Sequence, residues 1–302
     1  MWTRQKWLRL IKVRGVRLSL HPLFVLIMMA SVLTGHFIEL VTLFAIVFIH
    51  ELGHAVAASM LGARVVSIQM LPFGGVAEIE DQGCLPAWKE IVIALAGPLQ
   101  NLFMIAVLLL IRSLGAEQHE FVDYVIRGNL MIMLFNLLPV LPLDGGKIVQ
   151  ALLSILLSYH AVLQHTLRVS MVCSLMMCVA AIIPAISGKG PLYLNMLAMG
   201  LFLFYSNFTD YRNLPYRFVR FLLGRDSQYR KKLEKGIIAT PIISHPVQHL
   251  EGILRLFKRE KYHMIYVMNE EGGIIAMLPE QRLIRSFFTN YHASGPPDRN
   301  IS

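Results

Sequence analysis

The segment VTLFAIVFIHELGHAVAASM, residues 41–60, decides how this chain is organised. It is an apolar run long enough to span a membrane, yet it carries His50, Glu51 and His54 near its middle. In a helix, residues four apart lie on one face, so both imidazoles can reach one zinc ion while Glu51 stands beside the ion's open position. Each charged group at bilayer depth costs about 2.5–3.5 kcal/mol on insertion scales, so these side chains need a functional reason. The pattern predicts the catalytic helix of an intramembrane metalloprotease.

Composition and charge place the chain among polytopic membrane proteins. Of its 302 residues, 55% are hydrophobic and only 16% are charged, which is more apolar than the usual globular balance. The formal net charge is +9, and the basic residues gather at positions 4–17 and 212–235. Both clusters are typical of cytoplasmic segments beside membrane helices, so we expect both termini in the cytoplasm. Contact with anionic lipid explains such clusters, and we expect no nucleic-acid partner.

Apolar runs predict an α-helical polytopic membrane protein with about six transmembrane helices. The runs cover residues 18–34, 41–60, 88–112, 124–138, 169–186 and 192–208. An even number of spans returns the chain to the cytoplasm, as the two basic clusters require. The third run contains LAGPLQN, residues 95–101, whose glycine and proline allow helices to approach closely. Asn101 can hydrogen-bond across a bundle, and we interpret this motif as helix packing.

Residues 63–79, ARVVSIQMLPFGGVAEI, predict a membrane-associated β-hairpin. β-Branched residues dominate the segment, and Pro72 with Gly74 and Gly75 interrupts it. Non-helical backbone at membrane depth is tolerated where protein or a water-filled cavity shelters it. A hairpin beside the 41–60 helix would offer a sheet edge to an extended peptide, as suits a protease. A hairpin at the cytosolic surface is an equally good interpretation of the same residues.

A second polar motif follows the fourth apolar run, in NLLPVLPLDGGK, residues 136–147. Two prolines and two glycines interrupt the helix, and Asp144 is the only acid. An Asp-Gly pair is ordinarily a turn. A catalytic zinc, however, needs three protein ligands plus water, and His50 and His54 supply only two. Asp144 is therefore the best candidate for the third ligand, and the predicted topology brings all three side chains to similar depth.

The residues after position 210 predict a soluble C-terminal part behind a membrane metalloprotease domain at 1–210. We expect a basic linker at 211–232, a small α/β domain at 233–292 and a disordered tail at 293–302. The α/β domain has about 60 residues and hence little core of its own. We therefore expect it to pair with a second copy in a homo-oligomer.

Taken together, the motifs HELGH, MLPFGG, LAGPLQN and NLLPVLPLDGGK resemble those of the site-2-protease-type intramembrane zinc metalloproteases. The resemblance covers essentially the whole chain, and residues 233–292 look like a CBS domain. It implies one zinc ion per chain on His50, His54 and Asp144, with Glu51 as the general base. It also implies that the loop and hairpin bind substrate through Asn136, Pro139, Pro142, Phe73, Gly74 and Gly75.

The order of parts resembles family members that act in endospore formation, which implies particular partners. The substrate would be pro-sigma-K, whose N-terminal pro-sequence is removed at the mother-cell membrane around the forespore. Membrane inhibitor proteins would regulate this cleavage, and the CBS-like domain would bind ATP. No glycine-rich or acidic nucleotide signature is visible in that domain. An anti-sigma factor or remnant signal peptides are alternative substrates for the same chemistry.

Two other classes of function compete with the protease. A membrane metal transporter would use intramembrane His and Asp residues, but the apolar runs contain neither an internal repeat nor a second such cluster. A catalytically inactive scaffold would have no use for Glu51 beside the metal. Zinc-dependent hydrolysis of a membrane-bound substrate would separate the three classes, and we expect the protease.

Overall fold

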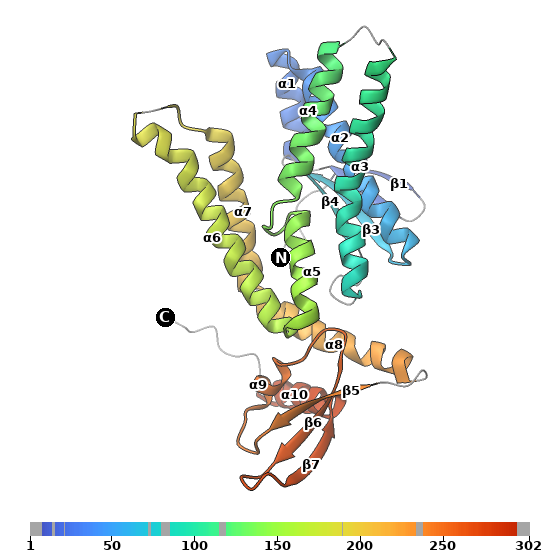
Figure 1. Cartoon of the computed structure of the whole chain (residues 1–302), viewed down its shortest axis with the longest axis vertical. Helices are drawn as coiled ribbons and strands as arrows, with labels where there is room; N and C mark the ends of the chain where they lie inside the picture. The colour runs from blue at the N-terminus through green and yellow to red at the C-terminus, as the bar shows by residue number, and fades with distance from the viewer. Residues whose placement is uncertain are drawn as a thin grey trace. The chain divides into compact units, whose positions relative to one another are not determined.

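A computed structural model of the chain (Figure 1) falls into two compact units. The residues that it describes are 8–13, 16–20, 22–71, 74–79, 85–114, 119–188, 190–233 and 238–294. The first unit consists of Met1–Ala151 with Val169–Asn207, and the second consists of Leu152–Arg168 with Phe208–Ser302. Helices α6 (Tyr159–Ile186) and α7 (Leu194–Arg212) each have residues in both units.

Membrane-length helices dominate the first unit. Among the described residues, three helices are long and apolar enough to cross a membrane, namely α2 (Phe37–Met60), α3 (Ala87–Ser113) and α6. The unit also contains α1 (Pro22–Thr34) and α4 (His119–Asn136), with most of α5 (Asp144–Leu156) and of α7. The structure therefore supports a helical membrane protein, but six spanning helices are not confirmed.

The predicted first span differs from the structure. Helix α1 has 13 residues, fewer than the roughly 17 that a helix needs to cross the hydrocarbon core. It is short because residues 18–20, which we assigned to the span, belong to strand β2 (Val16–Leu20). Apolar and polar residues alternate along VRLSL, and this period of two favours a strand over a helix.

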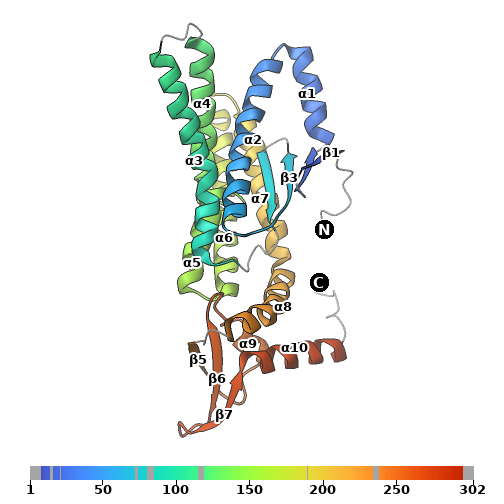
Figure 2. The ribbon, with the colours of Figure 1, turned by 90° about the vertical axis from the view of Figure 1, so that its right-hand side faces the viewer.

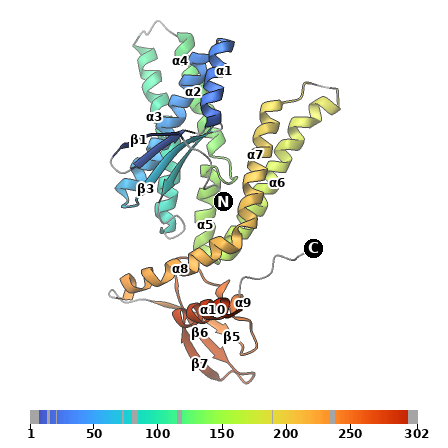
Figure 3. The same cartoon turned by 180° about the vertical axis from the view of Figure 1, so that it is seen from behind.

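The predicted hairpin is confirmed and is part of a larger sheet. Strands β3 (Val65–Leu71) and β4 (Gly74–Ile79) pair antiparallel, with Leu71 opposite Gly74. Strand β2 joins β3 in parallel, and β1 (Leu8–Val13) pairs antiparallel with β2, so the order is β1-β2-β3-β4. Figure 3 shows this sheet beside α2, which contacts both β3 and β4. At the start of the chain we expected only a basic cluster, and we did not predict β1 and β2.

Small residues bring α2, α3 and α4 close together, which fixes the frame of the site. A Cβ placed on Gly53 of α2 would lie 2.8 Å from the carbonyl oxygen of Ala96 in α3, so only glycine fits there. Gly128 of α4 faces the side-chain ends of Leu43 and Ile46 in α2, each 3.2 Å from a Cβ placed on it. These close approaches hold the three helix backbones at short range around the middle of α2.

The second unit contains a three-stranded sheet with helices on one face (Figure 2). The sheet order is β5-β6-β7, with β5 parallel and β7 antiparallel to β6. After the end of α7, the elements of this unit are α8 (Leu214–Leu233), β5 (Ala239–Ser244), α9 (Leu250–Leu254), β6 (Tyr262–Met268), β7 (Ile274–Pro279) and α10 (Glu280–Ser294). This small α/β arrangement is compatible with the expected fold class, but a CBS domain is not confirmed. We expected a disordered tail at 293–302, but residues 293 and 294 end α10, and 295–302 lie outside the described residues.

We predicted a linker at 211–232, but residues 214–232 form most of helix α8 instead. Phe218, Phe221 and Leu222 are buried in the same core as Ile242 and Ile265 of the sheet. Spacings of three and four residues put the apolar side chains on one helix face, which the many basic residues between them obscured. The helix therefore supplies part of the core that we expected a second copy to supply.

Candidate metal centre

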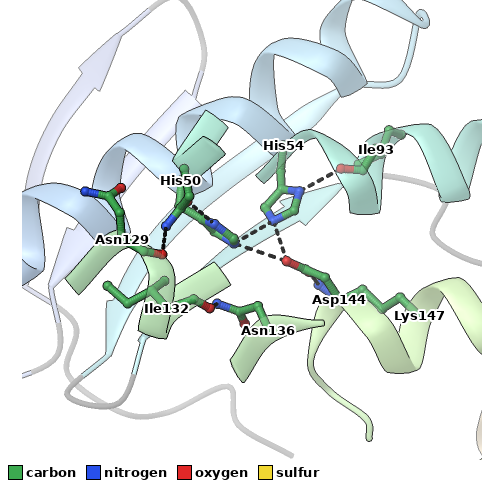
Figure 4. Close-up of polar contacts among 9 residues, drawn as sticks. His50, His54, Ile93, Asn129, Ile132, Asn136, Asp144 and Lys147 are labelled. Carbon is green, nitrogen blue, oxygen red and sulfur yellow. Dashed lines mark hydrogen bonds and ion pairs between the residues drawn. The ribbon is translucent and has the colours of Figure 1, made fainter. Parts of the chain in front are cut away.

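Two histidines of α2 and the first residue of α5 converge on one point in the first unit (Figure 4). The Nε2 atoms of His50 and His54 lie 3.2 Å apart, and Asp144 Oδ2 lies 3.1 Å and 3.0 Å from them, respectively. All three residues are buried, with at most 4% of their surface exposed. The structure thus brings together the three side chains that we predicted as zinc ligands.

The other nitrogen of each imidazole is bonded to a protein oxygen, which fixes the tautomer. His54 Nδ1 lies 2.7 Å from the Ile93 carbonyl, which can only accept, so this nitrogen carries a proton. His50 Nδ1 lies 2.7 Å from Asn101 Oδ1. The Asn101 amide nitrogen donates to the Asn129 carbonyl, so its oxygen must face His50 and accept the proton of Nδ1. Both neutral imidazoles therefore direct Nε2 lone pairs at the common point.

This arrangement fits a zinc ion. Two nitrogen lone pairs and a carboxylate oxygen point at one another with no proton among them when the imidazoles are neutral, and a cation removes their repulsion. Three atoms at these separations can all lie about 2 Å from one point, which is the length of Zn–N and Zn–O bonds. Histidine donating its second nitrogen proton to a protein oxygen is the usual outer shell of zinc sites. The donor set of two imidazoles and one carboxylate matches catalytic zinc centres.

Glu51 lies beside the two histidines and is also buried, with 7% of its surface exposed. A ligand atom of Glu51 and one from each histidine all lie within 4.8 Å of one another. Strand β4 covers this carboxylate, because a Cβ placed on Gly75 would lie 2.9 Å from Glu51 Oε1. Gly75 therefore allows the hairpin backbone to approach the carboxylate more closely than any other residue would.

Asp144 lies in the first turn of α5, and its two carboxylate oxygens have different partners. Oδ2 faces the histidines, whereas Oδ1 accepts a hydrogen bond from Lys147 Nζ at 3.0 Å. An acid at this position is favoured by the partial positive charge of a helix N-terminus. Gly145 and Gly146 let the turn pack on the preceding loop, since a Cβ on Gly146 would lie 2.5 Å from the Leu141 nitrogen. The carboxylate is thereby held with a single oxygen toward the common point.

One face of α3 contacts both histidines, a part in the site that we did not predict from the sequence. Ile93, Gly97 and Asn101 follow one another at intervals of four and so share this face. A Cβ on Gly97 would lie 2.6 Å from His50 Nε2 and would also meet His54 Nε2. We interpreted LAGPLQN as packing alone. The four-residue spacing of a glycine and an asparagine could have indicated a face that approaches and orients the catalytic helix.

The residues predicted to bind substrate lie in different surroundings. Gly75 contacts Glu51, while Pro139 and Pro142 are exposed in the loop before α5. Asn136 ends α4, and its amide donates to the Ile132 carbonyl of the same helix. Gly74 begins β4. Phe73 lies outside the described residues.

Comparisons with known proteins add relatives to this geometry. The profile of peptidase family M50 matches residues 38–128 and 113–181. Stage IV sporulation protein FB of Bacillus subtilis is 33% identical over 287 residues, which is 94% of each chain. A zinc metalloprotease of Methanocaldococcus jannaschii is 35% identical over 164 residues, 49% of this chain and 45% of the relative. The solved site-2 protease from Methanocaldococcus jannaschii aligns with a TM-score of 0.55 at 26% identity, covering 68% of this chain and 95% of that one.

Proposed function

The chain belongs to peptidase family M50 and is a zinc metalloprotease, and from this premise we propose that it cleaves a membrane-associated protein precursor at a site built on α2. One observation carries the proposal. His50 Nε2, His54 Nε2 and Asp144 Oδ2 lie 3.0–3.2 Å from one another, while both Nδ1 protons are donated to protein oxygens. Such a set of buried acceptors supports a metal centre in these residues.

The contacts of each side chain suggest its role in peptide-bond hydrolysis. His50, His54 and Asp144 would hold the zinc, which when bound lowers the pKa of a coordinated water and polarises a carbonyl. Glu51 would accept a proton on its carboxylate and deliver it to the leaving amine. Its burial and its position within 4.8 Å of the histidine nitrogens support this role. Pro139, Pro142 and Asn136, with the start of β4, would line the path of the substrate.

For the substrate we propose a pro-sigma factor, pro-sigma-K, whose N-terminal pro-sequence is removed. The support is the 33% identity over 94% of both chains to a protein named for sporulation. An anti-sigma factor and remnant signal peptides remain the alternatives with the same chemistry. Coexpression with each candidate precursor, scored for a clipped product, decides among them. Clipping of an anti-sigma factor with pro-sigma-K left intact would overturn this choice of substrate.

Protease and transporter are separated by one biochemical experiment. Purified protein in detergent should clip the precursor, lose this activity to a zinc chelator and regain it when zinc is returned. The same protein reconstituted in vesicles should show no zinc flux above that of empty vesicles. Zinc flux without any clipped product would contradict the protease and favour a transporter.

Regulation and assembly belong to the same proposal. We propose that both termini are cytoplasmic, that membrane inhibitor proteins of the sporulation system hold the enzyme inactive and that it forms homo-oligomers. The basic clusters at 4–17 and 212–235 support the cytoplasmic termini, and the 33% identity to a protein named for sporulation supports partners from that system. ATP binding by residues 233–292 rests on the family resemblance alone. Titration of the purified protein with ATP, followed by calorimetry, tests the nucleotide, and light scattering in detergent tests the oligomer.

A further inference from the structure

Leu141, three residues before Asp144, has both of its backbone groups bonded to buried side chains. Its N–H donates to Ser170 Oγ at 2.9 Å, and its carbonyl accepts from Asn207 Nδ2 at 2.5 Å. Ser170 belongs to α6 and Asn207 to α7. Both side chains are 1% exposed, and Leu141 is 7% exposed. Two helices distant in sequence thus hold one residue of the loop that leads to Asp144.

The orientation of the Asn207 amide follows from its partners. Its nitrogen lies within hydrogen-bond distance of two carbonyl oxygens, those of Leu141 and Leu203, and a carbonyl requires a donor. Pro139 and Pro142 keep this stretch out of a regular helix, so the Leu141 groups cannot use intrahelical partners. In an apolar setting such groups must find partners within the protein. Ser170 and Asn207 therefore supply the hydrogen-bond partners that the Leu141 backbone lacks because the helix is interrupted here.

A direct path of packed atoms leads from Leu141 to the carboxylate. Gly146 packs against Leu141 so closely that a Cβ on it would lie 2.5 Å from the Leu141 nitrogen. The Leu143 nitrogen donates to the Val140 carbonyl at 2.9 Å, which closes the turn before Asp144. A shift of Leu141 must therefore move the first turn of α5. That turn sets the position of Asp144 Oδ2 relative to the two histidines.

We propose that Ser170 and Asn207 are positioning residues that hold the loop before α5 so that Asp144 completes the metal centre. The inference rests on the proposed role of Asp144 as a zinc ligand. Neither side chain touches the metal ligands in any contact described above, so their effect passes through the Leu141 backbone. Loss of either hydrogen bond lets the loop relax, and zinc leaves the site faster although both histidines and Asp144 are still present.

The test measures zinc transfer from the full-length protein in detergent to a chromogenic chelator. Ser170→Ala and Asn207→Leu should lose zinc about tenfold faster than the unchanged protein, at the low end of the effect of outer partners on metal affinity. Ser170→Thr keeps the hydroxyl and should release zinc at nearly the original rate. The absorption bands of the cobalt-substituted protein should shift in Ser170→Ala and return in Ser170→Thr, because they report the ligand geometry directly.

Matched controls lie on the same two helices. Ser174 is equally buried at 1% exposure, but its hydroxyl donates to the Ser170 carbonyl of its own helix, so Ser174→Ala removes the same group away from the loop. Asn195 is exposed near the start of α7, so Asn195→Leu controls for the other exchange. Equal zinc release by Ser170→Ala and Ser174→Ala, with unshifted cobalt bands, would overturn the positioning role even if Asn207→Leu fails to fold. An unchanged protein that binds no zinc would instead overturn the metal centre itself, and this inference with it.

Discussion

Each imidazole of the centre has one nitrogen bonded to a protein oxygen and the other directed at a common point with Asp144. His50 depends on the Asn101 side chain for this orientation, whereas His54 depends on the Ile93 carbonyl. A side-chain partner can be removed by substitution, but a backbone partner cannot. The role of the partner can therefore be tested by substitution for His50 but not for His54.

Replacing Asn101 should weaken zinc binding without removing a ligand. Asn101→Leu has nearly the same size but cannot accept the His50 Nδ1 proton, so the ring loses its fixed tautomer and orientation. We expect zinc affinity to fall about 10- to 100-fold, measured by competition with a chelator. Asn129→Leu is the matched control, since Asn129 is also fully buried but its amide donates to the Val125 carbonyl of its own helix. Equal affinities of the two variants would show that Asn101 does not orient His50.

At the scale of elements, the approach of α3 to α2 makes room for the two imidazoles. Gly97→Ala puts a Cβ 2.6 Å from His50 Nε2, so either the ring or the helix must move. We expect at least about tenfold weaker zinc binding. Gly128→Ala meets only the flexible ends of Leu43 and Ile46, at 3.2 Å, and should bind zinc normally. Metal analysis of both purified variants checks this, and full zinc occupancy in Gly97→Ala would refute the close approach.

Motif spacing could predict the elements that carry the site, because helical geometry alone relates His50 to His54. Asp144 followed from the number of ligands that zinc requires. The Ile93 carbonyl could not be predicted, since every residue carries the same backbone group. Strand β1 was harder than β2, because a register shift between Arg9 and Ile11 interrupts its alternation. Helix α8 was taken for a linker because its charged residues outweigh its apolar face in composition, although not in spacing.

The two units of the whole molecule are held by different chemistry. The first unit buries the three acceptor atoms of the metal centre, which a bound cation would stabilise. The second unit buries an ion pair, Arg225 with Glu280. Arg225 of α8 donates to both oxygens of Glu280 and to the carbonyls of Lys258 and Lys261. His263 of β6 stacks on Phe257 and contacts the same carboxylate at 3.2 Å. This network joins α8 to the sheet and explains why a segment so rich in basic residues is part of a core.

Acid should loosen the second unit first through His263 and then through Glu280. Burial lowers the pKa of His263 below 6.5, with Arg225 and Lys258 adding to the effect against Glu280. Burial raises the pKa of Glu280, but hydrogen bonds from His263 and Arg225 bring it below 4.5. Both folded-state pKa values are depressed, so the unfolded chain binds more protons and stability falls as pH drops. The loss begins near pH 6.5 through His263 and grows below 4.5 through Glu280.

Hydrogen exchange of the β6 amides in the full chain measures this stability. Protection should begin to decline as pH falls below 6.5, after correction for the intrinsic exchange rate. His263→Gln removes the titrating group and should flatten that part of the profile while leaving the decline below pH 4.5. A profile of the same slope in both proteins would assign the acid sensitivity to other groups.

The proposed cleavage needs both a metal ligand at Asp144 and a base at Glu51, and the Glu51→Gln protein tests these separate roles. Zinc content and precursor cleavage are measured on one purified sample, beside the unchanged protein and Asp144→Asn. We predict that Glu51→Gln keeps about one zinc per chain but cleaves at least about 100-fold more slowly, as expected when a general base is lost. Asp144→Asn should lose zinc under the same conditions. Cleavage by zinc-loaded Glu51→Gln at the original rate would contradict the account.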